Sequence, residues 1–400
     1  MLALCDYQAI KPNRMTQQLL TTLADALYAY QLGGRGVYPF AMHPHTTSAP
    51  GFWHAWGAHE AQALARAGHV LRRADYIASA RREIETLFAW QLATERVHEL
   101  GVLPRREGQQ VYGVNCVVQA CMNLYEATRE IRYAQMAGLH ASWLAGNNFA
   151  RAKMYDANTG RGYDGIDVID GRLKVNRNSG AESTIEALMI LQAVAHVPEA
   201  AKYLHYQMSA QQSWQIIEAE AGRMVAGKPV IKSADEMNEA RISGGRYYEL
   251  KNGDAISITF DVTDSNDYLL YVARLRRALA VTHRQPMLRR RGYSLTPRKQ
   301  FSHGALILQF DNNARLIVPE TISLDRDFMW LDSVTVRPVK LRVGRHTLRV
   351  SYRSLDRNAH TIIDGFMLHP AIATKILQSP SGARLNLRFP VQKGALTWRE

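Results

Sequence analysis

The chain has 400 residues, which is too long for one compact core and predicts two or three domains. Hydrophobic residues make up 46% and charged residues 21%, the proportions of an ordinary globular protein. No segment approaches the roughly eighteen uncharged apolar residues of a membrane-spanning helix. We therefore expect no membrane partner.

The net charge of +13 raises the question of nucleic-acid binding. The densest basic run, from Arg274 to Arg298, has the pattern of one long loop between strands, and no recognition helix or nucleic-acid motif accompanies it. An acidic sugar polymer or an acidic partner surface explains the charge as well, so we do not expect nucleic acid.

The amino-terminal residues lack a basic segment followed by a sustained apolar one, so they are not a secretory signal as they stand. Localisation stays open between extracellular, if the natural start lies upstream, and cytoplasmic. The three cysteines do not form a disulfide framework, since Cys116 and Cys121 point to different faces of a predicted helix. We expect three reduced thiols.

The first half of the chain has the pattern of an all-helical domain, spanning 1–210. Its apolar residues recur at three- and four-residue spacing, in segments rich in Ala, Leu, Gln, Glu and Arg. Glycines and prolines separate these segments. The predicted helices are Thr16–Gln31, His54–Arg73, Ala74–Glu95, Val111–Arg129, Ile131–Ala145, Ala181–His196 and Glu199–Ser209.

After residue 210 the apolar pattern changes to a period of two, which is typical of strands. The predicted strands are Ala255–Val262, Tyr268–Ala273, Ala305–Phe310, Ser333–Val336, Lys340–Val343 and His346–Tyr352. Several short strands at this spacing indicate a β-sandwich over 215–370. The C-terminal extension, 371–400, contains one more strand pattern at 383–389, whose place in the fold the sequence does not give.

Three carboxylates of the β region suggest a metal site. Glu218 and Glu220 lie two apart in the first strand and so share a face, where they repel each other unless a cation lies between them. Asp364 comes from the last strand, and three oxygen donors suit Ca²⁺. Paired glutamates on a strand are more often a solvated face.

The order of the β motifs resembles carbohydrate-binding modules of families 6 and 35 over about residues 215–370. A Glu-Ala-Glu first strand, a Gly-Gly-Arg-Tyr-Tyr loop and a closing Ile-Asp-Gly-Phe-Met-Leu strand follow one another. The resemblance implies a structural calcium held by Glu218, Glu220 and Asp364. It also implies aromatic side chains that stack on sugar rings. The substrate-binding candidates in this region are Tyr247, Tyr248, Trp330 and Asn358.

In the helical half, an unusual Gly- and Asp-rich connection at 154–180 leads into an almost continuously apolar helix. Ser179 and Glu182 have the spacing of a capping box, which is one interpretation of Glu182. The other interpretation is a catalytic or substrate-binding carboxylate at the amino end of the helix.

The motifs at 155–165 and 176–184 resemble the last inner helix of six-hairpin, (α/α)6-toroid glycosidases, and similar segments occur in helical domains attached to glycosyltransferases. The resemblance covers about residues 15–205. It implies a carboxylic acid that protonates the leaving oxygen and a carboxylate that activates water. Asp164 and Glu182 are the predicted catalytic pair, with Asp156 and Asp167 in reserve. The predicted sugar-binding residues of this half are Trp53, His54, Trp56, Tyr163 and Asn178.

A full toroid needs about twelve helices, whereas the sequence predicts seven, so the domain is a fragment or a reduced form. An incomplete ring would expose an apolar wall that a partner covers. The sequence thus favours a carbohydrate-active, glycoside-hydrolase-like protein that acts on or binds a polysaccharide. The alternatives are a non-catalytic carbohydrate-binding or scaffold protein, and a lyase or epimerase that acts on uronic acids.

Overall fold

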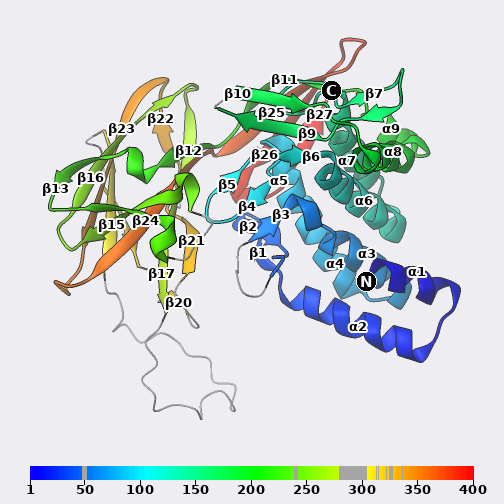
Figure 1. The fold of residues 1–400 in the computed structure, drawn as a ribbon, viewed down its shortest axis with the longest axis horizontal. Coiled ribbons are helices and arrows are strands. Elements are labelled where there is room, and N and C mark those ends of the chain that lie inside the picture. The colour runs from blue at the N-terminus through cyan, green and yellow to red at the C-terminus, as the bar shows by residue number, and fades with distance from the viewer. Residues whose placement is uncertain are drawn as a thin grey trace. The chain divides into compact units, whose positions relative to one another are not determined.

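The computed structural model describes residues 1–46, 52–170, 172–237, 242–278, 304–311, 313, 315–320, 322–323, 328–335 and 337–400. The chain divides into two compact units (Figure 1). The helical unit comprises Met1–Trp214 and Pro370–Glu400, and the sandwich unit comprises Gln215–His369. Most of the basic run, from residue 279 to Arg298, lies outside the described residues.

The helical unit contains helices of very different lengths. They are α1 (Leu2–Ile10), α2 (Arg14–Ala29), α3 (Glu60–Leu71), α4 (Ala74–Glu83), α5 (Ala89–Ala93), α6 (Val111–Thr128), α7 (Ile131–Ala141), α8 (Ala181–Ala195) and α9 (Pro198–Ala201). A π-helical stretch, Ile84–Phe88, joins α4 to α5 into one continuous rod. Among the described residues, no helix is long and apolar enough to cross a membrane.

Successive helices pair, and the first members of the pairs also touch one another. Helix α3 packs on α4 and α6, and α6 packs on α7 and α8. Close approach is built into the sequence at Gly138 of α7, where an added Cβ would lie 2.0 Å from the carbonyl oxygen of Ala200. The helices therefore form a row in which α3, α6 and α8 are neighbours.

Two predicted helices are much shorter in the structure, His54–Arg73 and Glu199–Ser209. The segment before Glu60 is not helical, because Trp53–His54 (β3) pairs with Glu99–Leu100 (β4) and Ala55–Gly57 forms a 3₁₀ turn. The last predicted helix ends at Ala201. Further on, Gln207–Gln212 forms a strand, β11, whose backbone pairs with Ile372–Gln378 (β25) instead of continuing the helix.

Short sheets connect the helices of this unit. Two-stranded pairings join β1 (Leu32–Gly34) to β2 (Val37–Met42), β4 to β5 (Pro104–Arg105), and β7 (Tyr155–Asp156) to β8 (Arg161–Gly162). In a three-stranded sheet, β9 (Gly165–Ile169) lies between β6 (Gln109–Gln110) and β10 (Arg172–Asn176). The C-terminal extension completes a four-stranded sheet, in the order β11 (Gln207–Gln212), β25 (Ile372–Gln378), β26 (Arg384–Pro390), β27 (Thr397–Arg399), visible as green and red arrows in Figure 1. The strand pattern at 383–389 is thus β26 of the helical unit.

The sandwich unit consists of two sheets whose strands pair mostly antiparallel. One contains β12 (Gln215–Glu218), β14 (Val230–Ser233), β15 (Arg246–Lys251), β17 (Asn266–Ala278), β20 (Ile322–Ser323), β21 (Phe328–Ser333), β22 (Val339–Leu341) and β24 (His360–Pro370). The other contains β13 (Arg223–Ala226), β16 (Ala255–Val262), β18 (Ala305–Phe310), β19 (Arg315–Pro319) and β23 (Gly344–Arg353). The β-sandwich architecture expected from the period of two is therefore present.

Alternation along the strands produces one buried cluster between the sheets. In β23 the inward residues Leu348, Val350 and Tyr352 are buried, and they meet β16 and β18 on either side. The strand predicted at Ser333–Val336 is displaced toward the amino terminus and forms β21, which pairs with β17 from Tyr271 to Arg276.

Candidate functional site

The predicted catalytic residues Asp164 and Glu182 lie together at the amino end of α8. Asp164 accepts a hydrogen bond from the hydroxyl of Ser183 in the first turn of the helix. Burial raises the pKa of the Asp164 carboxyl, and the nearby Glu182 and Asp167 raise it further. Glu182 is exposed, in the first helical turn.

The cap of α8 decides between the two interpretations of Glu182. The N-cap residue is Gly180, which has no side chain, and the hydroxyl of Ser179 lies 3.2 Å from that of Thr184 instead. The capping box predicted from Ser179 and Glu182 is therefore absent, and the carboxylate of Glu182 has no capping role.

Sequence reasoning missed a third carboxylate, that of Glu186. It lies one turn after Glu182, and an i, i+4 spacing puts both on one helix face. Asn115 of α6 donates a 2.6 Å hydrogen bond to Glu186 Oε2. Burial raises the pKa of Glu186, and Glu182 adds to the increase. The Glu-x-x-x-Glu spacing was the available signal.

The starts of α3 and α6 bring two further polar groups to the same end of the helix row. His59, which precedes α3, has its Nε2 3.2 Å from the hydroxyl of Tyr112 in α6. The backbone N–H of Val111 donates to the carbonyl oxygen of Asp164 at 3.0 Å. We call His59, Tyr112, Asp164, Glu182 and Glu186 the polar rim. Burial raises the pKa of Tyr112, and Cys116, Glu186 and Glu182 add to the increase.

The reserve carboxylates have different surroundings. Asp156 belongs to a tight turn, where it accepts hydrogen bonds from the N–H of Asn158 and the hydroxyl of Thr159. These bonds lower its pKa, the Thr159 hydroxyl most. Asp167 lies on β9 and acts on Asp164 electrostatically. Neither is as well placed as Asp164 to donate a proton.

The tryptophans near the start of α3 divide into one buried and one exposed ring. Trp53 is fully buried, so no sugar can stack on it, which corrects the role predicted for this residue. Trp56 is 49% exposed and stands edge-on to the rings of His54 and His98. His54 also accepts a hydrogen bond from the N–H of Trp56 through Nδ1, at 3.1 Å. His54 therefore positions Trp56.

The remaining sugar-binding candidates of the helical unit lie beside Asp164. Tyr163 is half-buried, with the guanidinium of Arg177 6.0 Å from its ring centre. Asn178 is exposed, and its carbonyl oxygen accepts a hydrogen bond from the N–H of Asp164 at 3.0 Å. Both flank the polar rim.

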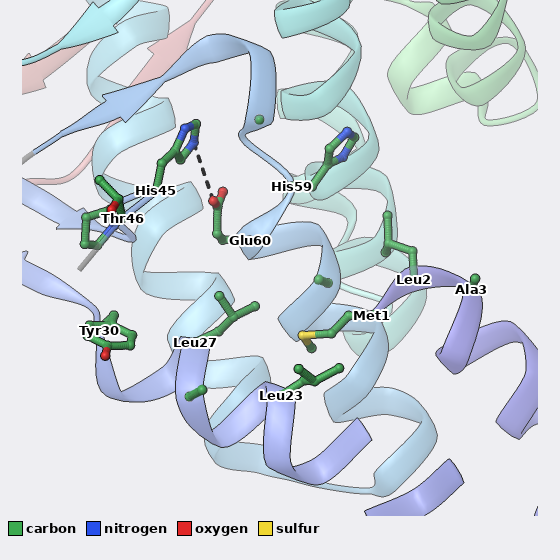
Figure 2. A pocket seen from close by; sticks show the side chains of 14 residues that line it. Met1, Leu2, Ala3, Leu23, Leu27, Tyr30, His45, Thr46, His59 and Glu60 are labelled. Atoms are coloured by element: carbon green, nitrogen blue, oxygen red, sulfur yellow. Dashed lines mark ion pairs between the residues drawn. The ribbon is translucent and has the colours of Figure 1, made fainter. Parts of the chain in front are cut away.

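A pocket of about 680 Å³ opens at the start of α3, with His59 in its lining (Figure 2). Its wall is mainly apolar, and Leu2 of α1 and Leu23 and Leu27 of α2 contribute to it. His45 and Glu60 stand side by side at one end, with 3.4 Å between His45 Nε2 and Glu60 Oε1.

Burial removes charge from this end of the pocket. The Glu60 side chain is only 14% exposed, and burial raises its pKa well above the ordinary range, with a further contribution from Glu83. Burial, assisted by His54 and His59, lowers the pKa of His45 to about 4. Burial therefore favours the neutral form of both side chains, and His45 is a neutral imidazole near neutral pH.

In the sandwich unit, the predicted calcium ligands gather around the turn at Ser243–Gly245. The Ser243 hydroxyl donates to Glu218 Oε1 at 2.5 Å, and its N–H donates to Asp364 Oδ2 at 3.3 Å. Glu220 Oε1 lies beside Gly244. Burial raises the pKa of both glutamates. Their Oε2 atoms are buried without a hydrogen-bond partner. Within the described part of the chain, however, no three His, Cys, Asp or Glu side chains are close enough to hold a metal ion.

The aromatic candidates of the sandwich are less accessible than predicted. Tyr247 and Tyr248 are 2% and 5% exposed because both rings pack inside the unit, which leaves no ring face for a sugar and corrects that prediction. Trp330 lies within β21, half-buried, with the Arg276 guanidinium 4.9 Å from its ring centre. Asn358 is exposed in the turn before β24.

No family model matches the chain, and no curated protein matches it. Solved structures that resemble it include an exo-β-1,3-galactanase from Phanerochaete chrysosporium, at 13% identity and a TM-score of 0.25, over 39% of this chain and 29% of that chain. A family 35 carbohydrate-binding module from Clostridium thermocellum matches at 13% identity and a TM-score of 0.26, over 39% and 98% of the two chains. A mosquito-larvicidal toxin from Bacillus thuringiensis matches at 11% and 0.28, over 39% and 23%. Similarities this weak carry no argument about function, which must come from the residues of the chain itself.

Proposed function

We propose that the protein is a carbohydrate-active, glycoside-hydrolase-like protein whose helical unit cleaves a glycosidic bond at the polar rim. The observation that carries this proposal is the convergence of Asp164, Glu182 and Glu186 beside one another at the start of α8. The resemblance of 155–165 and 176–184 to inner-helix motifs of six-hairpin glycosidases supports it.

The environments of the two predicted catalytic residues suit an acid and a base. Asp164 holds its proton to a higher pH than an ordinary carboxyl and so can protonate the leaving oxygen. Glu182 is exposed at a helix amino terminus, where the helix dipole favours a negative charge, and so can accept a proton from water. Trp56, exposed near the start of α3, would stack on a sugar ring.

The proposed architecture of the helical unit is a partial toroid. The pairs α3/α4, α6/α7 and α8/α9 follow one another as hairpins, and α3, α6 and α8 are neighbours. Helix α8 exposes Ile185, Leu188 and Met189, as the last inner helix of an incomplete ring would. In this proposal a partner covers that face.

The test is release of reducing ends from a polysaccharide panel. Asp164→Asn and Glu182→Gln should each lower the rate at least a hundredfold, because each removes one proton-transfer group. Glu199→Gln is the matched control for Glu182, since Glu199 is also exposed in the first turn of a helix. Equal activity in Glu182→Gln and Glu199→Gln contradicts the assignment. Binding to glycans without hydrolysis would favour the non-catalytic alternative, and an unsaturated uronide product would favour the lyase.

We propose further that the sandwich unit binds Ca²⁺ through Glu218, Glu220 and Asp364 and contributes affinity for the polysaccharide. The buried Oε2 atoms of the two glutamates support this, because an unpaired buried carboxylate is costly unless a cation or a proton compensates it. Since the side chains are not yet in ligand positions, binding requires them to converge around the Ser243 turn.

Calcium binding is tested by melting the protein with calcium and with EDTA. Calcium should raise the melting temperature of the sandwich unit, and Glu220→Gln should abolish the increase. Glu236→Gln is the control, because Glu236 is an exposed glutamate of the same unit. The same melting curve with calcium and with EDTA would refute the site.

A further inference from the structure

The pocket at the start of α3 has a chemistry unlike that of the polar rim. Its walls come from the first turn of α1 and from the face of α2 that carries Leu23, Ala26 and Leu27. Its volume of about 680 Å³ lies in the range of sites for small organic ligands. Figure 2 shows the leucines at one end and the His45–Glu60 pair at the other.

Few polar groups in this pocket remain available to a ligand. Both ring nitrogens of His59 lie within hydrogen-bonding distance of protein groups, Gln62 Oε1 at 2.8 Å and the Tyr112 hydroxyl at 3.2 Å. His45 Nε2 is buried, and its contact with Glu60 is long, at 3.4 Å. Tyr30 and Thr46 also belong to the lining, and Glu60 with His45 forms the polar pair at the end away from Leu23.

This distribution excludes a sugar as the best occupant. A sugar ring carries several hydroxyls, and each one buried against the leucines would lose its hydrogen bonds to water without replacement. A charged head group is also disfavoured, because it would lose its hydration among mainly apolar walls.

We infer that this pocket binds an uncharged organic molecule with an apolar body and a single hydroxyl head group, the head group pairing with Glu60 and His45 and the body lying along α2. The hydroxyl can accept a hydrogen bond from the Glu60 carboxyl or donate one to His45 Nε2. Apart from His59, the pocket and the polar rim have no residue in common, and the alcohol titration does not depend on hydrolysis, so either proposal can fail without the other.

Calorimetric titration of the whole chain with straight-chain alcohols tests the inference. From 1-hexanol to 1-octanol the Kd should fall about fourfold for each added methylene, the value for transfer of that group from water to an apolar site. Octylammonium and octanoate should bind at least tenfold more weakly than 1-octanol, and glucose should not compete. Absence of alcohol binding, or tighter binding of octylammonium, overturns the inference.

Two variants on α2 separate the pocket from general adhesion to apolar surface. Ala26→Trp fills the pocket from an exposed position and should abolish alcohol binding, whereas Ala29→Trp, equally exposed on α2 but outside the pocket, should keep it. Glu60→Gln should change the Kd less than about threefold, because the amide keeps a hydrogen-bonding group at this position, whereas Glu60→Leu should weaken binding about tenfold. Wild-type affinity in Ala26→Trp, or lost affinity in Glu60→Gln, contradicts the assignment.

Discussion

Replacing Phe389 with alanine tests whether the C-terminal strands belong to the core of the helical unit. Phe389 is fully buried on β26, where buried and exposed residues alternate from Arg384 onward, and its ring packs edge-on against Phe40 with centroids 6.2 Å apart. Truncating a buried phenylalanine to alanine costs about 3–5 kcal/mol, since both apolar burial and packing are lost. For a unit of this size, that corresponds to a fall in melting temperature of about 10 °C.

Thermal unfolding followed by tryptophan fluorescence measures this effect. Only Trp330 of the seven tryptophans belongs to the sandwich unit, so the signal reports mainly on the helical unit. Asn386→Ala, at an exposed position of the same strand, is the control and should shift the free energy of unfolding by less than about 0.5 kcal/mol. The reasoning fails if Phe389→Ala costs less than about 1 kcal/mol, or if the transition of the sandwich unit moves instead.

Three further outcomes follow from the structure. Trp56→Ala should raise the KM for a polysaccharide about tenfold with little change in kcat, because a stacking ring worth about 1 kcal/mol or more is removed; an unchanged KM would exclude the stacking role. Gly138→Val should destabilise the helical unit by at least about 2 kcal/mol in urea unfolding, since its side chain would collide with the carbonyl of Ala200; wild-type stability would show that the two helices can separate. In EDTA, the sandwich unit should melt at a lower temperature as the pH rises from about 4.5 toward neutral. Burial raises the pKa of Glu218 and Glu220, so the folded state holds protons that the unfolded chain has already released, and a melting temperature that increases over this range would contradict that account.

The sequence predicted the elements whose hydrophobic period was long and regular. Helix α6 ends within one residue of its prediction, and β16 has the predicted bounds. In β16 the alternation of apolar residues allows only one register that buries them all on the same face. The predictions failed where long-range backbone pairing decided the structure. Gln207–Gln212 has a helical composition, yet it pairs with β25, some 165 residues later in the chain.

The candidate site was predictable in part. That Asp164 and Glu182 lie close together could be predicted, because both belong to motifs around the amino end of the same helix. Burial of individual rings did not follow, because a Trp or Tyr near a loop has the same sequence pattern whether it faces solvent or the core. Trp53 and Trp56 are three residues apart, and only the pairing of β3 with β4 turns the first inward.

The pairing of β11 with β25 has a consequence for the order of assembly. Residue Gln212 of β11 faces Thr374 of β25 in one sheet, and the whole sandwich unit lies between them in the chain. During synthesis the ribosome must therefore complete the sandwich before the helical unit receives its last three strands and the ring of Phe389. The inserted unit can fold as soon as it is made, whereas the unit that begins first finishes last. A chain stopped after His369 should thus carry a folded sandwich on an incomplete helical unit.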